Sequence, residues 1–144
     1  MEIEINNVPT SWVMCANGEC QKTAECLRHI VFSNAPKGWR YAKCMLPAAW
    51  ADGKYSCFVR AEKVVLAKGF DKGFSSLTSR DARHDIRVIL SEQLGSKGTY
   101  DRLKKGERLL TRDEMQMIAT VFRQYTDFAD ADIFDELVQT YDFT

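Results

Sequence analysis

The chain has 144 residues and a mass of 16.5 kDa, which is the length of one domain or two small subdomains and excludes barrels and doubly wound enzymes. Hydrophobic residues make up 45% and aromatic residues 11%, enough to fill a core and to exclude a disordered chain. Twenty basic residues balance twenty acidic ones, so net charge alone predicts no polyanionic partner. The N-terminus does not match a signal peptide and no apolar run could span a bilayer, so we expect a cytoplasmic protein without membrane contact.

The first part of the chain is expected to combine one short helix with a small antiparallel sheet. Apolar residues recur at helical spacing within residues 22–32, which predicts the helix. Alternating residues within 39–43 and 55–59 flank an Asp-Gly turn and predict two paired strands. Residues 64–66 add a third candidate strand.

A longer amphipathic helix is expected to open the second part. Its apolar residues recur at helical spacing between Ala82 and Leu94, and Thr78 or Ser79 is the expected N-cap. Gly95 is expected to close it. The polar segment 97–105 that follows has room for about two helical turns.

A capping box predicts where the next helix begins. The side chain of Thr111 can accept a hydrogen bond from the backbone of Glu114, while the Glu114 side chain reaches back to Thr111. An apolar stripe follows within residues 115–125. Residues 133–141 are expected to add another short helix near the C-terminus.

These elements predict an α+β fold. Residues 1–77 form a cysteine-bearing part with a short helix and a small antiparallel sheet, and residues 78–144 form a part with three or four helices. The two are expected to make one integral unit. Charge is unevenly distributed, since residues 80–112 carry a net +4 and residues 113–144 a net −7, so a basic middle precedes an acidic tail.

Five cysteines, three of them within twelve residues, suggest a structural zinc site. Thiolates and imidazoles are the ligands that zinc prefers, and in the cytosol an odd number of cysteines favours thiols or metal ligands over disulfides. The spacing contains no compact Cys-x-x-Cys pair, however, so separately buried thiols that fill a core are the favoured interpretation, the metal site comes second, and reactive thiols are a third. The candidate ligands are Cys15, Cys20, Cys26, His29, Cys44 and Cys57.

No motif in the sequence identifies a reaction. The chain has no glycine-rich phosphate loop, no His-Glu-x-x-His and no Gly-x-Ser-x-Gly. The only imidazoles are His29 and His84, and nothing beside either marks it as a catalytic base. No catalytic residue is predicted, and an enzyme would require a cysteine beside one of these histidines in a cleft.

Residues 85–125 contain a helix, a Gly-Ser turn, a short basic segment, a Gly-Glu-Arg corner and a capped helix, in that order. This order resembles the helix-turn-helix of repressor and phage-regulator families. The resemblance implies that the short segment enters the major groove of double-stranded DNA while basic side chains contact phosphates. The implied contact residues are Lys97, Thr99, Tyr100, Arg102, Lys104, Lys105 and Arg108.

Short motifs along nearly the whole chain carry a second resemblance. They include Val8-Pro9, the cysteine block ending in Cys26-Leu27-Arg28, Cys57-Phe58 and Leu110-Thr111. With these motifs the chain resembles a family of small uncharacterised proteins of gut bacteria, a domain of unknown function. The resemblance implies one integral unit and supplies no activity.

Two functions follow from these patterns. The leading hypothesis is a small cytosolic nucleic-acid-binding or regulatory protein with a structural metal site. The alternative is a protein-interaction module whose acidic, aromatic tail, residues 127–144, binds a partner. A single exposed basic face would favour the first hypothesis, and an exposed aromatic patch in the tail would favour the second.

Overall fold

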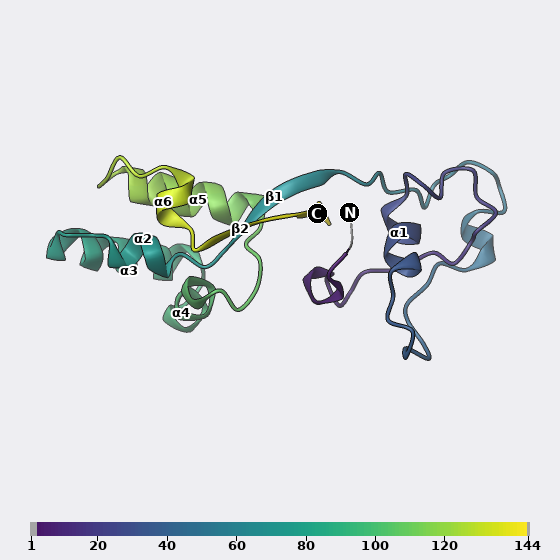
Figure 1. Ribbon diagram of the computed structural model, residues 1–144, viewed down its shortest axis with the longest axis horizontal. Helices are drawn as coiled ribbons and strands as arrows, with labels where there is room; N and C mark the ends of the chain where they lie inside the picture. The colour runs from purple at the N-terminus through teal and green to yellow at the C-terminus, as the bar shows by residue number, and fades with distance from the viewer. Residues whose placement is uncertain (1–2, 144) are drawn as a thin grey trace. The chain divides into compact units, whose positions relative to one another are not determined.

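The computed structural model describes residues 3–143, and the chain divides into two compact units (Figure 1). The first unit comprises Met1–Val64 and Thr140–Thr144, and the second comprises Val65–Gln139. The boundary expected between residues 77 and 78 falls inside the second unit. Helices and strands account for 40% and 11% of the fold, which confirms the mixed α+β class.

The first unit is built around one short helix surrounded by long irregular segments (Figure 1). Helix α1 (Leu27–Ser33) follows Cys26, whose extended backbone forms the N-cap. At the other end the Asn34 side chain donates a hydrogen bond to the Ile30 carbonyl at 2.8 Å. Two single turns of 3-10 helix, η1 (Ile5–Asn7) and η2 (Pro47–Ala49), complete its described helical structure.

The strands expected within 39–43 and 55–59 are wrong. Tyr55 has a φ of +55°, a left-handed conformation that interrupts an extended strand. The described part of this unit carries two isolated bridges instead, which pair Met14 with Cys44 and Cys26 with Arg60. The candidate strand 64–66 is confirmed as part of a longer strand described below.

A small core holds the first unit together. Leu27 and Val31 of α1 are fully buried, and Met14 and Tyr141 pack with them. At its margin the rings of Trp12 and Phe143 meet edge to face, with centroids 5.0 Å apart. Few side chains are completely withdrawn from water here, so apolar burial contributes modestly to this unit's stability.

The sheet consists of two antiparallel strands, β1 (Lys63–Lys68) and β2 (Glu136–Tyr141). Two further backbone hydrogen bonds extend the pairing just past the ends of the strands. At one end of the sheet the Asp142 amide donates to the Glu62 carbonyl at 2.8 Å, and at the other end the Asp135 amide donates to the Gly69 carbonyl at 3.0 Å. The helix expected over 133–141 is therefore wrong, because β2 takes most of it. Its valine, threonine and tyrosine favour an extended strand.

Three expected helices of the second unit are confirmed, and two short ones were not expected. Ser79 caps the first of the three and accepts a hydrogen bond from the Ala82 amide at 3.2 Å. Gly95, with a φ of +102°, follows its end. In chain order the helices are α2 (Asp71–Ser75), α3 (Arg80–Gln93), α4 (Lys97–Lys105), α5 (Arg112–Arg123) and α6 (Asp130–Ile133).

The predicted capping box at the start of α5 is confirmed. The Glu114 amide donates to the Thr111 hydroxyl at 3.2 Å, and the Thr111 amide donates to the Glu114 carboxylate at 2.9 Å. Arg108 adds two further hydrogen bonds to this carboxylate, at 2.8 and 2.9 Å. The two bonds of the capping box satisfy amides at the helix start that have no partner within the helix, and the Arg108 bonds hold the Glu114 carboxylate in place.

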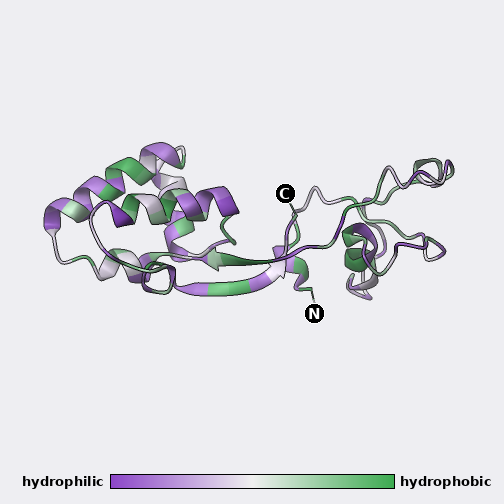
Figure 2. Cartoon of the chain, turned by 90° about the horizontal axis from the view of Figure 1, so that it is seen from above, coloured by the Kyte–Doolittle hydropathy of each residue, from purple (hydrophilic) through white to green (hydrophobic). Residues whose placement is uncertain are grey.

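Aromatic rings fill the core of the second unit. Phe70, Tyr100 and Phe122 are fully buried, and Phe70 meets each of the other two edge to face. Hydrophobic and hydrophilic residues alternate along these helices in Figure 2, as expected for helices with one face turned to a core. None of the helices within residues 3–143 is long and apolar enough to cross a membrane.

A cysteine-lined pocket as a candidate metal site

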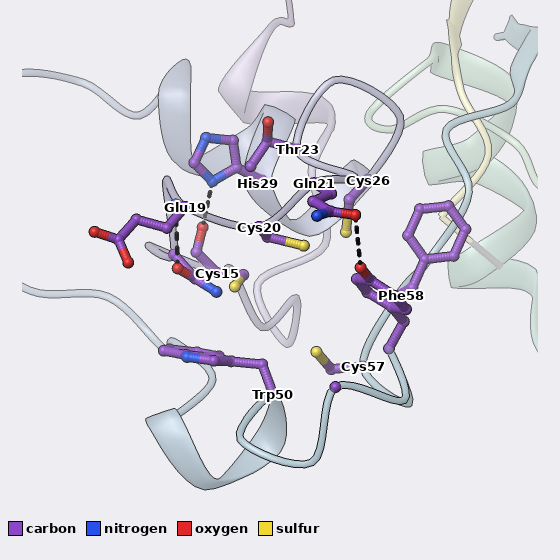
Figure 3. Close-up of a pocket in the computed structure, with 13 residues that line it drawn as sticks. Cys15, Glu19, Cys20, Gln21, Thr23, Cys26, His29, Trp50, Cys57 and Phe58 are labelled. Atoms are coloured by element: carbon purple, nitrogen blue, oxygen red, sulfur yellow. Dashed lines mark hydrogen bonds between the residues drawn. The ribbon is translucent and has the colours of Figure 1, made fainter.

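A cavity of about 330 Å³ in the first unit gathers most of the chain's cysteines. Figure 3 shows the sulfur atoms of its four cysteines turned toward a common space. The side chains that define it are Cys15, Cys20, Cys26 and Cys57, with the rings of Trp50 and Phe58 beside them. We call these four residues the thiol cluster.

The thiol cluster is assembled from three segments, and α1 connects them. Cys26 is the N-cap of α1. From the first turn of the same helix, Arg28 donates to the Cys57 carbonyl at 2.9 Å and to the Val13 carbonyl at 2.7 Å. One guanidinium therefore holds both the segment that carries Cys57 and the segment that leads to Cys15.

His29 positions the same loop rather than facing the sulfur atoms. Its Nδ1 lies 3.0 Å from the Cys15 carbonyl oxygen, and because a carbonyl only accepts, Nδ1 carries the proton. The Cys15 amide in turn donates to the Arg28 carbonyl at 3.2 Å. In Figure 3 the ring presents this nitrogen to the Cys15 backbone. Its contact therefore fixes the backbone from which one thiol of the cluster projects.

Burial and proximity favour the neutral thiol at Cys57. Burial raises the pKa of Cys57, and the nearby Cys15 and Cys26 raise it further, while Arg28 acts in the opposite direction. Cys15 and Cys26 are each only 7% exposed. Negative charge is thus unfavourable at Cys57 unless a cation shares the site.

The structure separates the predicted ligands into two groups. All five cysteines are free thiols. Cys44 lies outside the cavity: its backbone bridges to Met14, and its side chain packs against the small core. Within residues 3–143 no three His, Cys, Asp or Glu side chains already stand at metal-binding distances, so the sulfur atoms must move together to hold an ion.

The basic residues predicted to bind DNA lie on α4 and just after it. Lys97, Arg102 and Lys105 are exposed. The Arg102 side chain donates to the Thr99 hydroxyl at 3.3 Å and lies 3.6 Å from the Glu107 carboxylate. Lys97 and Lys105 are therefore the exposed cations of this helix that are left unpaired: among the described residues, no carboxylate lies within contact distance of either.

The other predicted DNA contacts are engaged within the protein. Tyr100 is fully buried, and this burial raises its pKa to about 12. The Lys104 ammonium lies 4.6 Å from the centre of the Phe74 ring, and Arg108 is held by the Glu114 carboxylate. These three side chains stabilise the second unit, and using them on phosphates would break those contacts.

Aromatic residues of the acidic tail also pack inside the protein. Phe134 is buried in the core of the second unit and Phe128 packs against that core, while Tyr141 and Phe143 belong to the core of the first. The exposed aromatic patch that the interaction hypothesis requires is therefore absent from these side chains. Leu137, 44% exposed, is the large apolar side chain that the described tail leaves at the surface.

Reasoning from the sequence missed the part that Arg28 plays in the site. From the sequence alone, an arginine next to cysteines is expected to be a surface charge. In the structure the Arg28 guanidinium donates to two backbone carbonyls, and its central carbon lies 5.3 Å from the centre of the Trp12 ring. The available signal was its position two residues after Cys26, within the helix predicted over residues 22–32. That position places its side chain beside the cysteine loops.

Comparison with known proteins identifies the family. The sequence profile of the family of unknown function DUF6078 matches residues 1–143. No curated protein and no solved structure matches the chain, so the helix-turn-helix resemblance gains no support. Because the match extends over both units, the chain belongs to DUF6078, a family of unknown function.

Proposed function

We propose that the first unit binds one zinc ion through Cys15, Cys20, Cys26 and Cys57, and that the ion has a structural role. The observation that carries this proposal is the convergence of four thiols from three chain segments on one cavity. Burying separate thiols as small hydrophobic residues does not require that they share a cavity. Convergence is what a tetrahedral ion requires.

The chemistry of the donors favours zinc over other ions. Four thiolates complete a tetrahedral zinc site, whereas calcium and magnesium require oxygen ligands. An iron–sulfur cluster also uses four cysteines, but its sequence motifs contain two cysteines separated by only two residues. In this chain four residues separate Cys15 from Cys20, and five separate Cys20 from Cys26.

The small hydrophobic core of the first unit also favours a bound ion, because apolar burial alone provides little stability. Its four buried core residues and one short helix provide little apolar burial for a segment of this length. Small domains of this kind often depend on a metal or disulfides for stability, and the five thiols here form no disulfide. Zinc binding would supply the missing folding free energy.

A site closed by four protein ligands has no position open for substrate or water, which favours a structural rather than a catalytic role. In this arrangement Arg28 and His29 are positioning residues, because they hold the backbone of Cys57 and Cys15. Outer contacts of this kind typically change metal affinity by about 10–100-fold. The function that follows for this site is to stabilise the first unit by holding a structural zinc ion.

Cobalt titration of the metal-free, reduced full-length protein tests the proposal, because Co²⁺ reports its own coordination by absorption. We expect one equivalent to produce the visible bands of a tetrahedral site and the near-ultraviolet charge transfer of cobalt–thiolate bonds, and zinc to displace it. Cys57→Ser should abolish this spectrum. Cys44→Ser is the matched control, because Cys44 lies outside the cavity, and it should retain the spectrum. Equal spectra for the two variants, or no tetrahedral spectrum in the unmodified protein, would contradict the proposal.

A further inference from the structure

The segment that follows α1 forms an exposed loop, residues 36–46, which we call the aromatic–basic loop (Figure 1). A turn fixes its start, since the Trp39 amide donates to the Pro36 carbonyl at 3.0 Å. Near its end the Met14 amide donates to the Lys43 carbonyl, and the Met45 amide donates to the Met14 carbonyl, both at 2.8 Å. The residues between these anchors are held at the surface of the first unit.

Aromatic rings on this loop face water. Tyr41 is 92% exposed and Trp39 is 50% exposed. Leu46, at the end of the same loop, is 73% exposed. Large apolar side chains clustered at a surface mark a binding site more often than scattered ones do, and tryptophan and tyrosine are the residues most often used for such contacts.

The charge around these rings has one sign. Between Glu25 and Asp52 the sequence contains no acidic residue. Lys37, Arg40 and Lys43 are all exposed, and within residues 3–143 no carboxylate pairs with any of them. The loop therefore presents three unneutralised cations next to two exposed rings.

A recess opens beside Trp39, one of the two exposed rings. This second cavity of about 330 Å³ is lined by Trp39 and Lys43 from the loop and by Pro9 and Trp12 from the N-terminal segment. Apolar walls with a cation at the edge suit a flat aromatic group attached to an anion.

We propose that the aromatic–basic loop binds single-stranded nucleic acid. Exposed aromatic side chains stack on the faces of unpaired bases, and cations placed between them bind the phosphates. In a duplex the base faces are covered by their neighbours, so these rings would find no partner there. Charge complementarity and the alternation of rings with basic residues together select this partner.

The contrast with α4 supports the choice of surface. That helix is also basic, but its aromatic residue Tyr100 is fully buried, and Arg102 lies near Glu107. It therefore lacks the exposed rings that stacking requires. The inference goes beyond the proposed zinc site and does not depend on it, because it rests on the exposure and charge of the loop.

Fluorescence anisotropy of a labelled oligothymidylate of about 20 nucleotides, a length that exceeds common single-strand site sizes, tests the inference on the full-length protein. We expect binding at low salt. If three phosphates are contacted, affinity should fall roughly 20-fold between about 50 and 200 mM salt. Trp39→Ala combined with Tyr41→Ala should weaken binding by about 30-fold or more, because each stacked ring contributes at least about 1 kcal/mol, or about fivefold in affinity. Trp39→Phe combined with Tyr41→Phe should restore most of it.

The control removes the same number of exposed basic residues elsewhere, as Lys97→Ala, Arg102→Ala and Lys105→Ala on α4. This variant should bind within about twofold of the unmodified protein. The corresponding loop variant, which combines Lys37→Ala, Arg40→Ala and Lys43→Ala, should lose most of its affinity for the oligonucleotide and most of the salt dependence of binding. A larger loss in the α4 variant than in the loop variants would overturn the inference. So would tighter binding of duplex than of single strand, or binding of anionic phospholipid vesicles with none of the oligonucleotide.

Circular dichroism and zinc content, measured on every variant, separate this inference from the zinc proposal. Tyr41→Ala alone serves as a second test, because a side chain that is 92% exposed contributes almost nothing to packing. Oligonucleotide binding that depends on the loop in a protein without zinc would retain the inference and reject the zinc site. A zinc-loaded protein that does not bind the oligonucleotide would do the reverse.

Discussion

Replacing Gly73 by alanine should destabilise the second unit, although alanine is the better helix former. Gly73 is buried in α2, and a methyl group added there would lie 2.7 Å from both the Cα and the carbonyl oxygen of Ile133. Ordinary contacts begin at 3.4 Å, so α2 and α6 would have to separate by about 0.7 Å. Overpacking of this kind costs about 1–3 kcal/mol, against a helix-propensity gain of at most about 1 kcal/mol.

Gly98→Ala in α4 is the matched control. A methyl group there meets only the Ser96 hydroxyl, at 3.8 Å, so this variant keeps the propensity gain without the clash. Urea unfolding of both variants, followed by circular dichroism, should lower the free energy of unfolding for Gly73→Ala and raise or preserve it for Gly98→Ala. Equal stabilisation by the two changes would show that α2 and α6 do not pack as described.

Three further outcomes follow from the structure. Phe122→Ala, which empties a fully buried position, should cost about 3–5 kcal/mol in urea unfolding. The Arg108 guanidinium lowers the pKa of Glu114 from 4.5, so this carboxylate stabilises the fold above that pH and ceases to do so as the pH falls through its folded pKa. Arg108→Ala should therefore flatten the loss of stability that occurs as the pH falls below 4.5. Chelation of the proposed zinc should abolish hydrogen-exchange protection in α1 and leave that of α3 unchanged, because only the first unit contains the thiol cluster.

Helices with local sequence signals could be predicted, whereas the sheet could not. Ser79 and the Thr111–Glu114 box mark helix starts through contacts three residues apart. The pairing of β1 with β2 joins segments far apart in the chain, and no local pattern encodes it. The same limit explains why residues 133–141 were expected to be helical, since their strand partner was unknown.

The sequence predicts that cysteines form the candidate metal site, but it does not predict which of the cysteines line the cavity. Residue type alone places every cysteine among the ligands, and only the tertiary arrangement separates Cys57, which lines the cavity, from Cys44, which does not. Residues 39–43 show the opposite failure. Their alternation resembles a strand, yet they form an exposed loop, because the described part of the first unit supplies no neighbouring strand to pair with them.

X-ray absorption at the zinc edge of the purified full-length protein tests the central claim most directly, because it reports both the presence of the ion and its ligands. The account predicts one zinc per chain with four sulfur neighbours at about 2.3 Å, and the same spectrum for Cys44→Ser. A zinc-free protein, or a shell dominated by nitrogen and oxygen at about 2.0–2.1 Å, would contradict it.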